Sequence, residues 1–314
     1  MDQSGSVAVK VTAQVLVRNR GSAHRGLRLP PVPIRLFLRS IPPITDLVLE
    51  RAALRLSLAT MIFRQFLHDE TACASYLFGC GTVGELAVVD GHADLVDDYI
   101  ATAEARGARI AAVIETHVQA DHVSGLPEMV AKTGATAYMP EGSGAEFDHH
   151  ALSDGELVKL GNTVIQAIAT PGHAPAHHAY LVTDHRRGDE PWMVLTGDAL
   201  LVGDAGRTDL HAGAGQTAEE MARALYRSLT RRLLVLPDHL LLYPAHYAGS
   251  VCGRGLSGNP ASTIGFERRH NHALAFDSEE AFVAALLEDI PPVPERQAEI
   301  VAANRSGKPL AAVT

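Results

Sequence analysis

Short apolar runs alternate with amphipathic segments through most of this 314-residue chain. Residues 86–90 and 109–115 have the length of buried strands, and residues 94–106 between them carry apolar side chains at helical spacing. Such alternation predicts a layered α/β domain, because each element buries its apolar face against another. The pattern continues, with further strands expected over 135–139, 163–169, 179–182, 192–195 and 240–243, and helices over 123–132, 218–229, 279–287 and 295–303.

Residues 1–60 differ in composition from the remainder of the chain. They hold nine basic residues against three acidic ones, together with five prolines. Proline interrupts helices and central strands, so we interpret residues 1–60 as an extension outside the folded core and residues 61–314 as the catalytic domain. An arginine-rich, acid-poor leader is also typical of an organellar transit peptide, and that alternative stays open beside a cytoplasmic location.

Charge, hydropathy and cysteine content exclude several classes of protein. A net charge of -9 disfavours a general nucleic-acid binder. Charged residues interrupt every apolar stretch, so we expect no membrane span. Cys73, Cys80 and Cys252 form no C-x-x-C pair, and this argues against a disulfide framework or a cysteine zinc knuckle. We interpret Cys73 and Cys80 as packed apolar residues.

Four polar clusters stand directly after apolar runs. The first is T-H-V-Q-A-D-H over residues 116–122, and the others are T-P-G-H, T-G-D and Y-P-A-H. Imidazole and carboxylate groups suit divalent first-row metals, and loops that follow successive strands commonly meet at one functional face. The clusters therefore predict a single metal site. The histidine and aspartate side chains of the four clusters are His117, Asp121, His122, His173, Asp198 and His246.

In this order the four motifs resemble those of the metallo-β-lactamase superfamily, and more closely its glyoxalase II and persulfide dioxygenase branch. The resemblance covers roughly residues 61–304. It implies an αββα sandwich, in which two mixed sheets are flanked by helices and the metal lies at one edge of the two sheets.

One departure from the family pattern separates two reactions. The hydrolases of this family hold two metal ions with H-x-H-x-D-H, whereas Gln119 stands here in place of the second histidine. A neutral amide is a poor replacement for imidazole in a zinc site. In persulfide dioxygenases, as the resemblance implies, one iron is held by the residues that match His117, His173 and Asp198. This two-histidine, one-carboxylate set leaves coordination positions open, and we expect one Fe(II) per chain, with zinc as the alternative.

The resemblance also implies roles for the residues around the metal. Asp121, His122 and His246 match the second-metal ligands of the hydrolases, and we expect them to orient the metal ligands or the substrate through hydrogen bonds. His177 and His178 have no counterpart of this kind, and we interpret them as residues at the edge of a strand.

Three further residues are candidates for contact with substrate. Arg207 lies in G-R-T-D, and its guanidinium suits the carboxylate of a thiol substrate; the alternative is that Arg207 and Asp209 brace a loop. Tyr243 is the first residue of the last motif, Y-P-A-H. Cys252 lies in a G-S-x-C-G insertion, where it either carries sulfane sulfur or is a small loop residue.

The resemblance therefore implies a dioxygenase that uses O2 to convert a low-molecular-weight thiol persulfide, such as glutathione persulfide, into sulfite and thiol. Two alternatives stay open: a thioester hydrolase of glyoxalase II type, and a non-catalytic member that binds a thiol. The expected partners are the thiol persulfide and O2, a separate rhodanese, and a second copy of the chain in a homodimer.

Overall fold

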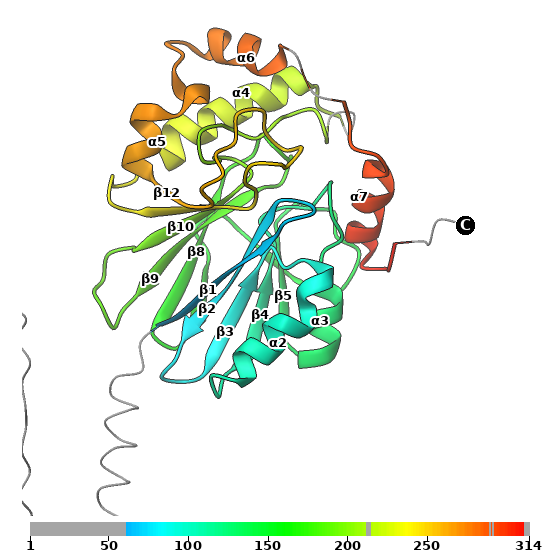
Figure 1. The fold of residues 1–314 in the computed structure, drawn as a ribbon, viewed down its shortest axis with the longest axis vertical. Coiled ribbons are helices and arrows are strands. Elements are labelled where there is room, and N and C mark those ends of the chain that lie inside the picture. The colour runs from blue at the N-terminus through cyan, green and yellow to red at the C-terminus, as the bar shows by residue number, and fades with distance from the viewer. Residues whose placement is uncertain (1–60, 212–214, 289, 291, 311–314) are drawn as a thin grey trace, which may run out of the picture. The chain divides into compact units, whose positions relative to one another are not determined.

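The computed structural model describes residues 61–211, 215–288, 290 and 292–310. The predicted extension over residues 1–60 lies outside the described residues. Two six-stranded mixed sheets form the body of the described part (Figure 1). The first sheet has its strands in chain order: β1 (Met61–His68), β2 (Cys73–Cys80), β3 (Glu85–Val89), β4 (Arg109–Ile114), β5 (Thr136–Pro140) and β6 (His150–Leu152).

The second sheet runs in the reverse order of the chain. Its strands are β12 (Ser262–Thr263), β11 (Leu241–Pro244), β10 (Met193–Gly197), β9 (His178–Asp184), β8 (Thr163–Ala169) and β7 (Leu157–Leu160). β10 and β11 pair in parallel, while β7 to β10 pair antiparallel. In the first sheet β1, β2 and β3 pair antiparallel, and β3 to β6 pair in parallel.

Helices cover the outer face of each sheet. The turn η1 (Ala93–Leu95) and helices α2 (Val96–Glu104) and α3 (Leu126–Thr133) lie against the first sheet. Over the second sheet pack α4 (Ala218–Ser228), its continuation η2 (Leu229–Leu233), α5 (Ile264–His270), the turn η3 (His272–Leu274) and α6 (Glu279–Leu287). Helix α7 (Gln297–Ser306) lies near the ends of both sheets (Figure 1). None of the helices in the described part is long and apolar enough to cross a bilayer.

The predicted αββα sandwich is confirmed, and its layers explain the continuous apolar runs in the sequence. Every residue of β2 and of β10 is buried, because each strand faces helices on one side and the opposite sheet on the other. The layer between the sheets includes Tyr76 and Phe78 from β2 and Tyr180 and Leu195 from the second sheet.

Helix α4 shows how the sequence determines one of the outer layers. Thr217 and Glu220 form a capping box at its start, which satisfies backbone donors of the first turn. Met221, Leu225 and Leu229 are spaced for one helical face, and all three are buried. Leu225 and Leu229 pack in the apolar core over the second sheet.

The predicted elements recur with small shifts at their ends. The strand expected over 163–169 has those bounds, and the helix expected over 94–106 is divided into η1 and α2. The sequence pattern did not predict β1, β2, β6, β7, β12 or α5. Four of these are short, between two and seven residues, and so few residues carry too little periodicity to stand out.

Replacing Leu225 by alanine tests the packing of α4 on the second sheet. The side chain is fully buried, so we expect Leu225→Ala to lower the free energy of unfolding by about 2–5 kcal/mol through lost contacts and a residual cavity. Urea unfolding followed by circular dichroism measures this change. The matched control is Val235→Ala, because Val235 is 67% exposed and its loss should change stability by less than about 0.5 kcal/mol. Equal losses in the two variants would contradict the assigned core.

Candidate metal centre

Three loops at the ends of β4, β8 and β10 bring His117, His173 and Asp198 together. All three side chains are buried. The Oδ2 atom of Asp198 lies 3.8 Å from His117 Nε2 and 3.4 Å from His173 Nε2. One ligand atom from each residue lies within 4.8 Å of the others. Two imidazole nitrogens and one carboxylate oxygen at these separations can bind a single ion.

The two histidines are oriented by hydrogen bonds from their outer nitrogens. His173 Nδ1 donates to the carbonyl oxygen of Arg207 over 2.8 Å, and this leaves Nε2 unprotonated in the neutral ring. That Nε2 is buried and has no hydrogen-bond partner. His117 Nδ1 lies 2.9 Å from the hydroxyl of Thr116. Burial and the nearby His173 hold the pKa of His117 well below its ordinary value, so the His117 ring is neutral, as a metal ligand has to be.

Asp198 is fixed through both its backbone and its side chain. Its backbone N–H donates to His177 Nε2 over 3.1 Å, and its two carboxylate oxygens accept from His246 Nδ1 over 2.7 and 2.9 Å. Burial would raise the pKa of this carboxyl group, but the charge and hydrogen bond of His246 lower it well below the ordinary value. Asp198 is therefore anionic at neutral pH and is a candidate metal ligand.

His177 has more than the strand-edge position that we expected. It is buried immediately before β9, its ring stacks 5.1 Å from that of His117, and its Nδ1 lies 2.8 Å from the hydroxyl of Thr170. Burial lowers the pKa of His177 to about 3, so its Nε2 is free of a proton and accepts from Asp198. His178 begins β9 as the interpretation requires.

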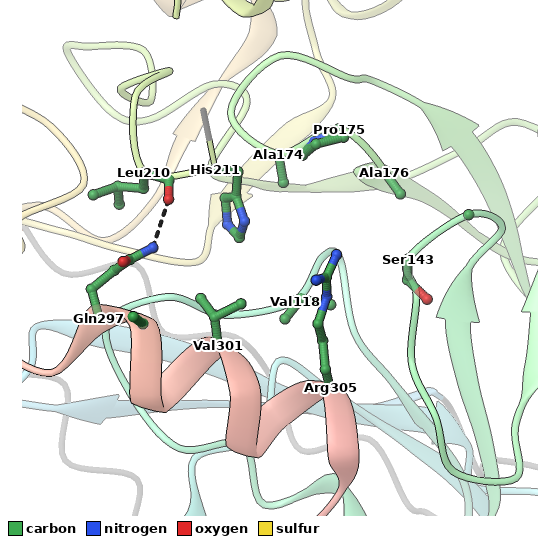
Figure 2. A pocket seen from close by; sticks show the side chains of 12 residues that line it. Val118, Ser143, Ala174, Pro175, Ala176, Leu210, His211, Gln297, Val301 and Arg305 are labelled. Atoms are coloured by element: carbon green, nitrogen blue, oxygen red, sulfur yellow. Dashed lines mark hydrogen bonds between the residues drawn. The ribbon is translucent and has the colours of Figure 1, made fainter. Parts of the chain in front are cut away.

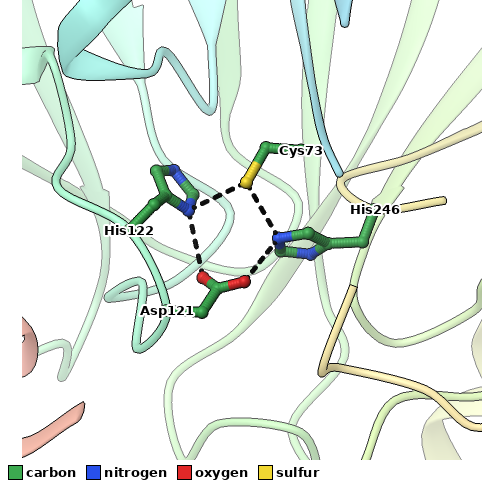
Figure 3. A group of neighbouring side chains, drawn as sticks. All are labelled: Cys73, Asp121, His122 and His246. Atoms are coloured by element: carbon green, nitrogen blue, oxygen red, sulfur yellow. Dashed lines mark hydrogen bonds and ion pairs between the residues drawn. The ribbon is translucent and has the colours of Figure 1, made fainter. Parts of the chain in front are cut away.

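Cys73, Asp121, His122 and His246 form a second cluster (Figure 3). His246 connects it to Asp198 of the first cluster. The His246 Nε2 atom lies 2.8 Å from Asp121 Oδ2, and His122 Nδ1 lies 3.0 Å from Asp121 Oδ1. Because both nitrogens of His246 face carboxylate oxygens, which only accept, its ring carries a proton on each. Against the effect of burial, Asp121 and Asp198 hold the pKa of His246 well above its ordinary value. Asp121 is thus connected through His246 to the candidate ligand Asp198 by hydrogen bonds.

Cys73 belongs to this second cluster, and its interpretation as an apolar packed residue is wrong. Its Sγ lies 3.3 Å from His122 Nδ1 and 3.2 Å from His246 Nε2 (Figure 3). Burial opposes ionisation, yet the two histidines lower the pKa of Cys73 to about 6. The sequence held no local signal of this, because both partners are distant in the chain.

Gln119 lies in the metal-binding loop, but its side chain is engaged elsewhere. Its Nε2 donates to Asp90 Oδ1 over 3.2 Å and to Glu115 Oε2 over 3.3 Å. Burial and the adjacent Asp90 raise the pKa of Glu115 to about 8. The amide therefore stabilises two buried acids at the position where a second histidine of the family would bind metal.

Arg207 has the contacts of a loop brace. Its guanidinium makes two hydrogen bonds of 2.7 Å to the carboxylate of Asp209. Other contacts reach the carbonyl oxygens of Val251 and Pro292, both over 3.3 Å. The side chain is 6% exposed. The geometry matches the bracing alternative, in which Arg207 also places the carbonyl that holds His173.

The other two substrate candidates also contact neighbouring side chains: Tyr243 is half-buried and Cys252 is buried. The Tyr243 ring packs against Phe63 and Tyr76, with ring centroids 4.9 and 5.5 Å apart. Cys252 is buried, and its Sγ lies 3.5 Å from Asp121 Oδ2. Burial and Asp121 raise the pKa of the Cys252 thiol well above its ordinary value, and this favours the protonated, less reactive form.

The sequence analysis missed His211, which lies beside the predicted ligands. Its ring centroid is 6.4 Å from that of His117 and 6.2 Å from that of His173. Its Nε2 is buried without a hydrogen-bond partner, and burial lowers the pKa of His211 to about 4. The sequence feature that could have identified His211 is its position two residues after Asp209, at the end of the loop that begins with Asp198.

Gly206 provides a test of how tightly the centre is built. A Cβ at this position would overlap the carbonyl oxygen of Asp198 and approach His173 Nδ1. We therefore expect Gly206→Ala to weaken metal binding by about 10- to 100-fold, as changes around metal ligands commonly do. Competition with a chromophoric chelator measures the affinity. Gly188→Ala is the matched control, because a Cβ there meets nothing within 4 Å. An unchanged affinity in Gly206→Ala would contradict the arrangement described.

Comparison with known proteins places this centre in a family. A model described as the metallo-beta-lactamase superfamily matches residues 68–246. The human protein named persulfide dioxygenase ETHE1, mitochondrial, is 29% identical over 223 residues, which cover 71% of this chain and 79% of that protein. A probable metallo-hydrolase from Burkholderia pseudomallei is 32% identical over 260 residues, covering 71% and 84%.

A solved structure agrees with the sequence relatives. The crystal structure of ETHE1 from Myxococcus xanthus is similar with a TM-score of 0.68 and 32% sequence identity, covering 78% of this chain and 99% of that one. The matched residues include the motifs that end at His173, Asp198 and His246. The chain therefore belongs to the metallo-β-lactamase superfamily, in the branch that holds persulfide dioxygenases and glyoxalase II-like hydrolases.

Proposed function

We propose that the chain is a mononuclear non-haem iron dioxygenase that oxidises a thiol persulfide to sulfite and thiol. One observation carries the proposal: His117, His173 and Asp198 converge as two imidazoles and one carboxylate, while the Gln119 amide is bound to Asp90 and Glu115. A set of three protein donors with open positions is typical of Fe(II) oxygenases. The similarity to proteins named persulfide dioxygenase supports the same activity.

The stoichiometry of the proposed reaction shows which oxidation and reduction the site has to support. A persulfide, dioxygen and water give the thiol, sulfite and two protons, so the terminal sulfur is oxidised and dioxygen is reduced. Bound Fe(II) would supply the dioxygen chemistry. His117, His173 and Asp198 would hold it, with His173 oriented by the Arg207 carbonyl and Asp198 by His246. Their burial keeps bulk water from the reacting sulfur.

A thioester hydrolase is the second candidate, because a specific feature favours it. Asp121, His122 and His246 are all present beside Asp198, and the resemblance implies that these positions hold a second ion in the hydrolases. The probable metallo-hydrolase among the relatives points the same way. The two functions differ in metal content, in their need for dioxygen and in their substrate.

Metal analysis and oxygen uptake distinguish the two candidates. We expect about one iron per chain in protein purified without oxygen, and oxygen uptake that depends on glutathione persulfide. His173→Ala should lose the iron and the uptake, since it removes one of three ligands. His185→Ala is the matched control, because this histidine is exposed and pairs only with Asp189 among the described residues.

The opposite result is equally definite. Two zinc ions per chain, together with cleavage of S-lactoylglutathione in the absence of oxygen, would replace the dioxygenase by the hydrolase. Metal-loaded, folded protein that turns over neither substrate would favour the non-catalytic alternative. The separate rhodanese and the homodimer stay predictions.

A further inference from the structure

The second cluster brings four potential metal donors together where the two sheets meet (Figure 3). Cys73 comes from the start of β2, Asp121 and His122 come from the loop after β4, and His246 comes from the loop after β11. The side chain of Asp121 is 6% exposed, and the other three residues are buried. Buried polar groups are costly unless each is paired, so this convergence of three distant segments is not explained by packing of apolar surface.

The separations between the four donor atoms suit one small ion. Cys73 Sγ lies 3.3 Å from His122 Nδ1 and 3.2 Å from His246 Nε2. Asp121 Oδ1 lies 3.0 Å from His122 Nδ1, and its Oδ2 lies 2.8 Å from His246 Nε2. Zinc bonds of about 2.0–2.3 Å in a tetrahedral site put neighbouring donors roughly 3.3–3.5 Å apart. A change of about 0.5 Å or less in these four contacts brings them to that separation.

The type and the charge of these donors match zinc. Thiolate, imidazole and carboxylate groups are the usual protein ligands of zinc, and a sulfur ligand disfavours magnesium and calcium. The thiolate and the carboxylate supply two negative charges, while the two imidazoles bind as neutral rings. The donor set therefore balances the charge of one divalent ion in a buried position.

The orientation of His246 separates this site from the first cluster. The Nε2 atom of its ring faces Cys73 and Asp121, whereas Nδ1 donates to the carboxylate of Asp198. The two nitrogens lie on different edges of the imidazole ring. An ion bound to Nε2 is therefore on the other edge of the ring from Asp198, and it does not share that carboxylate with the first cluster.

Cys73 distinguishes the site from the second-ion site that the resemblance implies for the hydrolases. A catalytic zinc keeps one position for water or substrate, whereas four protein donors complete a tetrahedral zinc. With Cys73 as the fourth donor, no position is left for a nucleophilic water. None of the four donors lines the cavity of about 280 Å³ beside α7, whose lining includes Val118, His211 and Arg305 (Figure 2). The geometry is that of a structural site.

We infer that Cys73, Asp121, His122 and His246 form a closed zinc site, in which Cys73 is the thiolate ligand and the ion joins the two sheets beside the candidate metal centre. Bound through Nε2, His246 keeps its proton on Nδ1 and donates it to Asp198, in the way that metal-bound histidines commonly donate to a carboxylate. The inference concerns a second ion and does not depend on the dioxygenase reaction.

X-ray absorption at the zinc edge tests the site in the zinc-loaded, full-length wild type. We expect a sulfur ligand at about 2.3 Å beside nitrogen and oxygen ligands at about 2.0–2.2 Å. No sulfur is expected from the first cluster, because its three donors are two histidines and one aspartate. A wild type that binds no zinc, or whose zinc has no sulfur ligand, overturns the inference.

Serine variants identify the sulfur, since the chain has three cysteines. Cys73→Ser should lose the zinc–sulfur signal and bind this zinc about 100-fold more weakly or worse, because changes merely around metal ligands already cost about 10- to 100-fold. Cys80→Ser is the matched control: Cys80 is buried at the other end of β2, and its Sγ accepts from Asn162 over 3.7 Å. Competition with a chromophoric chelator measures the affinities.

Cys252→Ser separates the two cysteines near Asp121. The Cys252 thiol donates to Asp121 Oδ2 over 3.5 Å, so we expect its loss to leave the sulfur signal in place. A signal retained in both Cys80→Ser and Cys252→Ser assigns the sulfur to Cys73 even if Cys73→Ser does not fold. A signal lost in Cys252→Ser and retained in Cys73→Ser overturns the inference. Neither result alters the iron content and oxygen uptake by which the proposed function is judged.

Discussion

The buried carboxylate of Asp198 is the group on which the rest of the centre depends. A buried anion is costly unless hydrogen bonds and charges compensate it, and here His246 bonds its oxygens while His177 accepts from its backbone N–H. Gly197, at φ +53°, permits the turn that presents it from the end of β10. Only with Asp198 held in this way do His117 and His173 have a third ligand within reach.

Contacts of His246 and its neighbours also join the two sheets at one edge of the sandwich. Cys73, at the start of β2 in the first sheet, bridges to His246 just after β11 in the second, and the backbone N–H of Ala74 donates to the Ala245 carbonyl over 2.6 Å. The two sheets are therefore joined at the edge where the metal ligands gather. Helix α7 adds a third connection through Asn304. The arrangement of the sheets and the geometry of the site are thus determined by one set of contacts.

The sequence predicted those site residues that lie in short polar motifs directly after strands. It did not predict contacts between residues that are far apart in the chain. His117, His173 and Asp198 each end an apolar run, so their convergence followed from the expected layers. Cys73 gave no such signal, since its partners His122 and His246 are 49 and 173 residues away. The motif around Arg207 identified a residue suited to carboxylates, but the carboxylate beside it belongs to the protein's own Asp209.

Gln119 stands where hydrolases of this family have a metal-binding histidine, and its side chain has a structural role in this loop. Its amide donates to Asp90 and Glu115, two buried acids whose pKa values burial raises to about 6 and about 8. Its backbone carbonyl accepts from Asn304 and so helps to hold α7. Asp90 also accepts from Thr116, and Glu115 accepts from Ser124, so loss of the Gln119 amide would remove one donor from each acid. A histidine at 119 would therefore have to withdraw hydrogen bonds from two carboxylates before it could offer a nitrogen to a metal, and for this reason the three-ligand centre is favoured by the whole loop rather than by one side chain.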